Sequence, residues 1–167
     1  ISIFSFMSVG WGQDCDSGYV WIENIPINDW GEGEEDFISD NNCFYQFDLD
    51  VLQKFIDNSL ATIPMIWDAD ISGSIEPLEL GIQEWDGNGR LTLLWLYDYT
   101  INDDYTMSGE IPENIGDLTQ LDTLNLAFNQ LSGEIPQGIG SLINLNYLYL
   151  YRNQLSGTIP DSICNII

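Results

Sequence analysis

A segment of 24 residues repeats along the C-terminal part of the chain, and this repetition limits the folds available more than any other feature. Residues 107–130 read MSGEIPENIGDLTQLDTLNLAFNQ, and residues 131–154 read LSGEIPQGIGSLINLNYLYLYRNQ. Residues 155–167 begin a third copy, LSGTIPDSICNII. One copy cannot bury its own leucines, whereas stacked copies share a continuous core. The repetition therefore predicts a solenoid of stacked coils.

Each full copy contains the strand signature L-x-x-L-x-L. In a strand the leucines would point inward and the intervening positions would face solvent. Gly133 and Gly157 permit a tight bend, and the stretch from Ile115 to Leu118 predicts a short 3₁₀ turn. The leucines of the signature are Leu121, Leu124, Leu126, Leu145, Leu148 and Leu150.

An asparagine follows each strand, Asn129 in one copy and Asn153 in the next. A buried side-chain amide at such a turn can hydrogen-bond backbone groups of neighbouring coils that the turn leaves unpaired. The spacing therefore predicts a structural ladder of stacked asparagines.

The motif L-S-G-x-I-P-x-x-I-G-x-L at the start of each copy resembles the leucine-rich repeats of plant receptor ectodomains and of secreted bacterial proteins. The strictly periodic copies cover residues 107–167, about a third of the chain. The resemblance implies an α/β solenoid, a right-handed superhelix with a parallel concave β-sheet and an N-terminal cap. It is specific for the fold and says little about function.

An irregular copy precedes the regular ones. Residues 91–96 match the strand signature, but 11 positions separate Leu96 from Met107 where the regular copies have 5. This copy therefore carries a 6-residue insertion, the acidic loop around residues 102–104.

Residues 48–57 predict a short amphipathic helix that Asp48 or Asp50 would cap. A loop containing Trp85 follows, and residues 89–92 (G-R-L-T) then enter the first strand. This order is similar to the N-terminal cap of plant-type leucine-rich repeats, where G-R-V-T-x-L opens the array. The paired cysteines that the family places near this tryptophan are missing here.

These features divide the chain into three parts. Residues 1–12 are apolar or small before a polar segment, the pattern of a signal-peptide remnant, although a short buried strand is the alternative. Residues 13–90 form the N-terminal region and cap, and residues 91–167 hold the repeats. The next strand of the period would start beyond Ile167, so we expect a longer chain or an end covered by a partner.

Three cysteines are present, and export would make Cys15 and Cys43 the natural disulfide pair, leaving Cys164 over. The chain has no Asn-x-Ser/Thr acceptor site, which favours a bacterial protein over a plant or animal extracellular one. We therefore expect a secreted or cell-surface protein of bacterial origin.

Charge and composition exclude several functions. With 27 acidic and 3 basic residues, the net charge of −24 repels nucleic acids and anionic lipid head groups. No apolar run reaches the ~20 residues that span a bilayer. The absence of histidine rules out Ser-His-Asp and Cys-His centres. A carboxylate-pair hydrolase stays open, but nothing marks two of the acids, so we predict a protein that is not an enzyme.

The strand positions between the leucines are rich in aromatic residues. Exposed Trp and Tyr bury large areas at low entropic cost, so a concave face of this kind predicts binding of a protein or peptide, with a glycan as the alternative. The structural alternative is that these aromatic side chains only pair with one another across neighbouring strands. The candidate ligand-binding residues are Trp95, Tyr97, Asn125, Phe128, Tyr147, Tyr149, Tyr151 and Arg152.

The segment D-A-D-I-S-G-S-I-E-P-L-E matches a calcium-loop template. The weak candidate ligands are Asp68, Asp70, Ser72 and Glu79. Pro64 precedes the segment where a helix should enter, and a turn in the cap is the structural alternative. No other cofactor is predicted. The main hypothesis is a non-enzymatic recognition module, and the alternative is a structural or adhesive segment of a larger secreted surface protein, with or without calcium.

Overall fold

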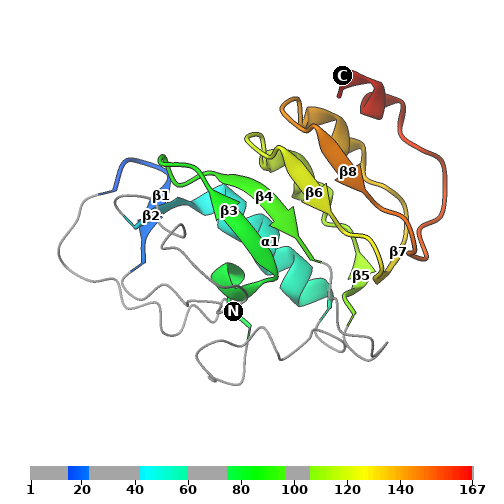
Figure 1. The fold of residues 1–167 in the computed structure, drawn as a ribbon, viewed down its shortest axis with the longest axis horizontal. Coiled ribbons are helices and arrows are strands. Elements are labelled where there is room, and N and C mark those ends of the chain that lie inside the picture. Colours follow the sequence, from blue (N-terminus) through cyan, green and yellow to red (C-terminus); the bar gives the residue numbers. More distant parts are fainter. Residues whose placement is uncertain (1–14, 23–41, 60–74, 97–105, 167) are drawn as a thin grey trace.

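The computed structural model describes residues 15–22, 42–59, 75–96 and 106–166 (Figure 1). The expected signal remnant, the acidic insertion, Tyr97 and three of the four calcium candidates (Asp68, Asp70 and Ser72) lie outside these ranges. No helix in the described ranges is long and apolar enough to cross a membrane.

A four-stranded sheet forms one wall of the molecule (Figure 1). Its strands, in spatial order, are β3 (Ile82–Trp85), β4 (Leu91–Trp95), β6 (Thr123–Asn125) and β8 (Tyr147–Tyr149). The strands β4, β6 and β8 are parallel and in register, so that Leu94 lies beside Leu124, which lies beside Leu148. The solenoid expected from the repeats is confirmed, because the strands of successive copies are adjacent parallel rungs.

Each regular coil closes through a second strand and a 3₁₀ helix. Strands β5 (Ser108–Glu110) and β7 (Gln130–Ser132) pair in parallel, and Ser156 continues this row through a bridge to Glu134. The expected 3₁₀ turn is present as η3 (Glu113–Asp117), and it recurs as η4 (Gln137–Ser141) and η5 (Asp161–Asn165). Gly133 makes the bend with φ +76°, a conformation that side chains disfavour.

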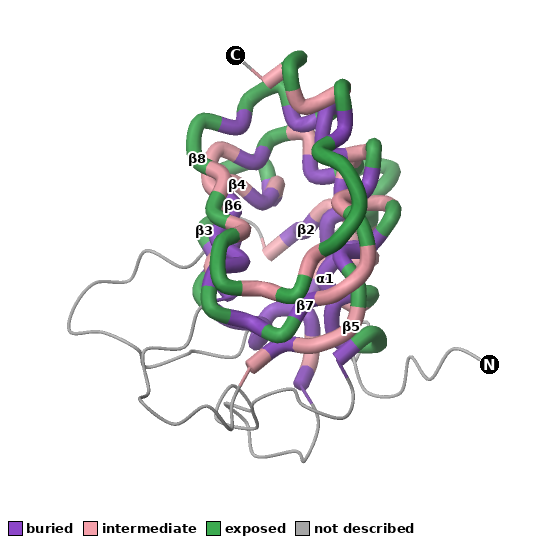
Figure 2. Tube along the Cα trace, turned by 90° about the vertical axis from the view of Figure 1, so that its right-hand side faces the viewer, coloured by how far each residue is buried: buried purple, intermediate pink, exposed green. Residues whose placement is uncertain are grey.

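The core is a column of aliphatic side chains enclosed by these coils. Leu94, Leu124 and Leu126 are 0% exposed. The helix α1 (Gln46–Asn58) lies behind the sheet and adds Val51, Leu52 and Phe55 to the same cluster (Figure 1). Figure 2 shows that the buried trace gives way to half-buried and exposed segments towards the C-terminal end.

The N-terminal part packs on α1 through a small two-stranded sheet. Strands β1 (Tyr19–Trp21) and β2 (Cys43–Tyr45) pair antiparallel, and the expected disulfide joins Cys15 to Cys43 with a Cα–Cα distance of 5.8 Å. Cys164 is a free, exposed thiol.

The helix predicted over residues 48–57 is confirmed as α1, but the prediction that Asp48 or Asp50 caps it was wrong. The N-cap residue is Tyr45, and no side chain caps the helix. Asp48 instead lies buried in the first turn and accepts hydrogen bonds from Arg90 Nε at 2.9 Å and from the Leu91 amide at 2.9 Å. Asp50 is bonded to Gln46. The carboxylate of Asp48 therefore joins α1 to the start of β4.

The segment before the first repeat strand is a β-hairpin, whereas the sequence predicted a loop around Trp85. Trp85 is the last residue of β3, and β3 runs antiparallel to β4. Asp86 makes the turn by accepting the amides of Asn88 and Arg90. A short 3₁₀ helix, η2 (Pro77–Glu79), precedes the hairpin.

Candidate functional site

The aromatic residues of β8 lie on the open face of the sheet, where inward leucines leave the alternate positions free. Tyr147 and Tyr149 are 55% and 39% exposed. Their rings are nearly parallel, with centroids 6.5 Å apart and an interplanar angle of 8°. Tyr151, also 55% exposed, meets Tyr149 edge-on at 6.3 Å.

Two further residues join these rings at the point where the chain leaves the strands. Phe128 and Arg152 occupy equivalent places in successive coils and have φ of +59° and +57°. The Phe128 ring lies 5.3 Å from Tyr151, and the Arg152 guanidinium lies 4.9 Å above Phe128. We call Phe128, Tyr147, Tyr149, Tyr151 and Arg152 the aromatic patch. A left-handed backbone conformation costs residues of this kind about 1–2 kcal/mol in steric strain, so other interactions of the fold must keep Phe128 and Arg152 in this conformation.

Two of the other candidates are less accessible than the sequence predicted. Asn125 is only 8% exposed, because its Oδ1 accepts the amide of Ala127, which is itself buried. Trp95 is half-buried, and its indole Nε1 has no hydrogen-bond partner among the described residues. Trp95, Asn125 and Tyr149 lie in a row across the three parallel strands, but the middle residue of this row is almost inaccessible to solvent.

Sequence reasoning missed the contribution of β3 to the open face. Ile82 lies beside Trp95 and is 47% exposed, and the exposed Glu84 lies beside Leu93. The alternation of Ile82, Gln83 and Glu84 was the available signal, since Gln83 points inward and is buried.

The asparagines after the strands bind backbone groups of two coils each. Asn129 Oδ1 accepts the Met107 amide at 2.8 Å, and its Nδ2 donates to the carbonyl of Leu96 at 2.8 Å. Asn153 Oδ1 accepts the Leu131 amide at 3.0 Å, and its Nδ2 donates to Leu126 at 2.7 Å. These bonds fix the turn that presents the aromatic patch.

A polar contact at the opposite end of the strands perturbs one carboxylate. Donation from the Asn146 amide and from the Thr123 hydroxyl lowers the pKa of Asp122 below its ordinary value of 3.8. Because the folded pKa is the lower one, this contact stabilises the fold above the unfolded pKa and is lost as the pH falls through the folded pKa.

We expect Asn146→Ala to raise the pKa of Asp122 back towards 3.8, because the hydrogen bond that lowers this pKa most is removed. The pKa is measured by following the carboxyl carbon of Asp122 by NMR between acid and neutral pH. Asn144→Ala is the matched control, since Asn144 donates to the Thr119 carbonyl and not to Asp122. An unchanged Asp122 titration in Asn146→Ala would contradict this assignment.

One calcium candidate can be located. Glu79 is 0% exposed, and its Oε2 accepts the backbone amide of Glu76 in the first turn of η2. Its carboxylate therefore already has a structural use. No group of three potential metal ligands occurs within the described ranges.

Comparison with known proteins places the coils among characterised repeats. Residues 120–142 and 144–166 match the Leucine Rich Repeat family. No curated protein sequence matches the chain.

Two solved structures share the fold over most of the chain. A plant ice-binding protein is 26% identical, with 74% of this chain and 38% of that chain covered and a TM-score of 0.57. The leucine-rich repeat ectodomain of the plant membrane receptor kinase GASSHO1/SCHENGEN3 from Arabidopsis thaliana, solved in complex with CASPARIAN STRIP INTEGRITY FACTOR 2, is 27% identical. There 70% of this chain and 14% of that chain are covered, with a TM-score of 0.51. The C-terminal part of this chain is therefore a solenoid of leucine-rich repeats.

Proposed function

We propose that the chain is a non-enzymatic recognition module that binds a protein or peptide through the aromatic patch on the open face of its sheet. The observation that carries the proposal is the cluster of exposed rings with a guanidinium at its edge. Tyrosine rings held on rigid strands bury area on binding and lose little side-chain entropy, which is the usual basis of a binding hot spot.

The net charge of the chain limits the choice of partner further. A net charge of −24 attracts positively charged partners and repels acidic ones, so a basic peptide or protein fits best. The GASSHO1/SCHENGEN3 ectodomain supports a peptide or protein ligand, because it was solved with a bound factor.

We place the protein outside the cell. The Cys15–Cys43 disulfide persists in oxidising compartments, and the receptor relative is an ectodomain. The bacterial origin expected from the missing glycosylation sites finds no support in the comparisons, since both solved relatives above are plant proteins.

The proposal is tested by selecting a displayed peptide library on the chain and measuring the selected peptides by calorimetry. We expect the triple variant Tyr147→Ser, Tyr149→Ser, Tyr151→Ser to bind them at least about tenfold more weakly, because the rings supply the buried area. The matched control is Ile143→Ser with Ile159→Ser, which removes apolar groups that are 70% and 68% exposed and lie outside the patch.

Equal affinity of the triple variant and the wild type would overturn the proposal, as would a library that yields no binder. That result would favour the alternative, a structural or adhesive segment of a larger secreted protein. Calcium stabilisation belongs to this alternative and is tested separately. A melting temperature that does not change at millimolar calcium would exclude it.

A further inference from the structure

One side-chain donor on the open face of the sheet has no acceptor among the described residues. Asn125 lies on β6 between Leu124 and Leu126, which point inward and are 0% exposed, so its own side chain is on the open face. Its Oδ1 accepts the amide of Ala127, and this bond identifies the remaining polar atom of the carboxamide as Nδ2. We call the two N–H groups of this Nδ2 the unpaired donor.

The unpaired donor is nearly closed to solvent, yet a small group can reach it. Asn125 is 8% exposed. Among the described residues that are not themselves exposed, Trp95 Nε1 is the only side-chain nitrogen or oxygen that is both fully buried and unpaired, so Nδ2 of Asn125 keeps contact with the surface. A donor in this position loses hydration without gaining a partner, and such groups are rare in folded proteins. An acceptor supplied by a ligand therefore gains more here than at a donor that water surrounds.

Large side chains flank Asn125 on both neighbouring strands. Trp95 lies beside it on β4, and Tyr149 lies beside it on β8. Neighbouring strands are about 4.8 Å apart, so these two residues are separated by roughly 10 Å. Ring contacts have centroid distances of about 4.5–7 Å, so the span is wide enough for one flat group over Asn125 with a ring on each side.

The unpaired donor also lies lower on the open face than the rings around it. Tyr147 and Tyr149 are half-exposed, whereas Asn125 is buried. The next outward residue of the same coil, Ala127, is also buried. A peptide main chain that rests on the tyrosines is therefore held away from Nδ2, and a side chain that projects from it is needed to reach the donor.

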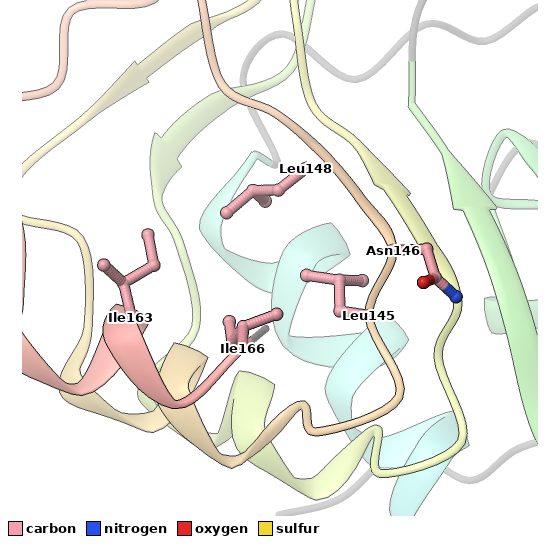
Figure 3. Close-up of a pocket in the computed structure, with 5 residues that line it drawn as sticks. All are labelled: Leu145, Asn146, Leu148, Ile163 and Ile166. Carbon is pink, nitrogen blue, oxygen red and sulfur yellow. The ribbon is translucent and has the colours of Figure 1, made fainter.

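Carboxylates at one end of the strands decide the charge of this side chain. Glu84 is exposed on β3, and Asp122 directly precedes β6. Donation from Asn146 lowers the pKa of Asp122, so this group stays ionised well into the acidic range. Figure 3 shows the amide of Asn146 pointing away from the aliphatic side chains drawn with it, which leaves it free to donate to Asp122. These negative charges repel a ligand carboxylate, so the acceptor that fits is a neutral carbonyl.

We propose that Asn125 is the polar anchor of the recognition site. Its Nδ2 donates to the carbonyl oxygen of a glutamine or asparagine side chain of the ligand, and Trp95 and Tyr149 contact the flat carboxamide from either side. The inference rests on the proposed function and adds a sequence requirement to it, because the partner is a basic peptide that carries a side-chain amide where it crosses β6. Asn125 therefore sets specificity, whereas the tyrosines supply most of the buried area.

The test uses peptides selected on the wild-type chain from the displayed library. Asn125→Asp keeps an oxygen for the Ala127 amide and replaces the donor by a second oxygen in the same place. We expect these peptides to bind the variant at least about tenfold more weakly in calorimetry, because two acceptors then face each other. The matched control is Asn144→Asp, which adds the same charge at an exposed asparagine that donates to the Thr119 carbonyl. We expect its affinity to stay within about twofold of the wild type.

Two measurements on the wild-type chain do not depend on how the variant folds. Replacement of the glutamine or asparagine of the peptide by methionine should weaken binding at least about tenfold, because the carbonyl acceptor is lost. The Nδ2 cross-peak of Asn125 in a nitrogen–proton NMR spectrum should move on peptide addition further than that of Asn144.

Equal affinity of Asn125→Asp and Asn144→Asp for the selected peptides would overturn the inference, as would an Asn125 cross-peak that does not move at saturation. Selected peptides that share no glutamine or asparagine would also overturn it. In each of these cases the triple tyrosine variant still binds more weakly than the wild type, so the proposed function stands. A triple variant that binds like the wild type, or a library that yields no binder, would end the proposed function and this inference together.

Discussion

Replacement of Asp48 by alanine should lower the free energy of unfolding by about 3–5 kcal/mol, because it leaves the Arg90 charge without its partner inside the protein. Asp48 is 0% exposed and accepts both Arg90 Nε at 2.9 Å and the Leu91 amide. Arg90 also packs on the Tyr45 ring at 4.0 Å and donates to Thr119 Oγ1. One carboxylate thus holds the helix, the first strand and the first complete coil together. Urea unfolding followed by circular dichroism measures the effect.

The matched control is Asp57→Ala on the same helix. Asp57 is paired with Lys54 at 3.8 Å on the surface, so its loss should cost no more than about 0.5 kcal/mol.

Burial raises the pKa of Asp48 in spite of Arg90, which shows that desolvation outweighs the attraction. We therefore expect Asp48→Leu with Arg90→Met to be more stable than Asp48→Leu alone. A double variant no better than that single one would contradict the account.

Replacement of Asn129 by alanine should lower the free energy of unfolding by about 2–4 kcal/mol. The change leaves the Met107 amide and the Leu96 carbonyl without a hydrogen-bond partner in the dry interior, and each unsatisfied buried group costs about 1–3 kcal/mol. Asn129 is only 8% exposed, so water cannot replace these bonds without opening the coil. Thermal and urea unfolding measure the loss.

The control is Asn153→Ala, the same change one coil later. Asn153 makes equivalent bonds, but its own side chain is only half-buried, so that water can reach the site once the amide is removed. We expect about half the loss found for Asn129→Ala. Equal losses at the two positions would show that burial does not set the value of these bonds.

The periodic half of the molecule was predictable because its sequence pattern and its physical cause coincide. Leucines recurring every 24 positions can be buried only by stacking, so the parallel register of β6 and β8 follows from counting, and that of β4 follows once its 6-residue insertion is allowed for. The exposed tyrosines of β8 follow from the same alternation.

The rest depended on contacts that no local pattern encodes. The residues next to Asp48 in the sequence predict that it caps the helix. Only the fold brings Arg90, 42 positions away, to its carboxylate. Asn125 occupies an outward position of its strand, yet its side chain is turned away from solvent, because its Oδ1 accepts a hydrogen bond from the Ala127 amide two residues later. The turn D-G-N-G at residues 86–89 is a hairpin signal that could have predicted the pairing of β3 with β4.

The antiparallel β3 gives the solenoid a direction. Because β3 pairs with β4 in the opposite sense, the parallel order of the repeat strands does not continue on that side of the sheet. The hairpin of β3 and β4, held to α1 by the buried Asp48, therefore fixes where the row of parallel strands begins and which way those strands run.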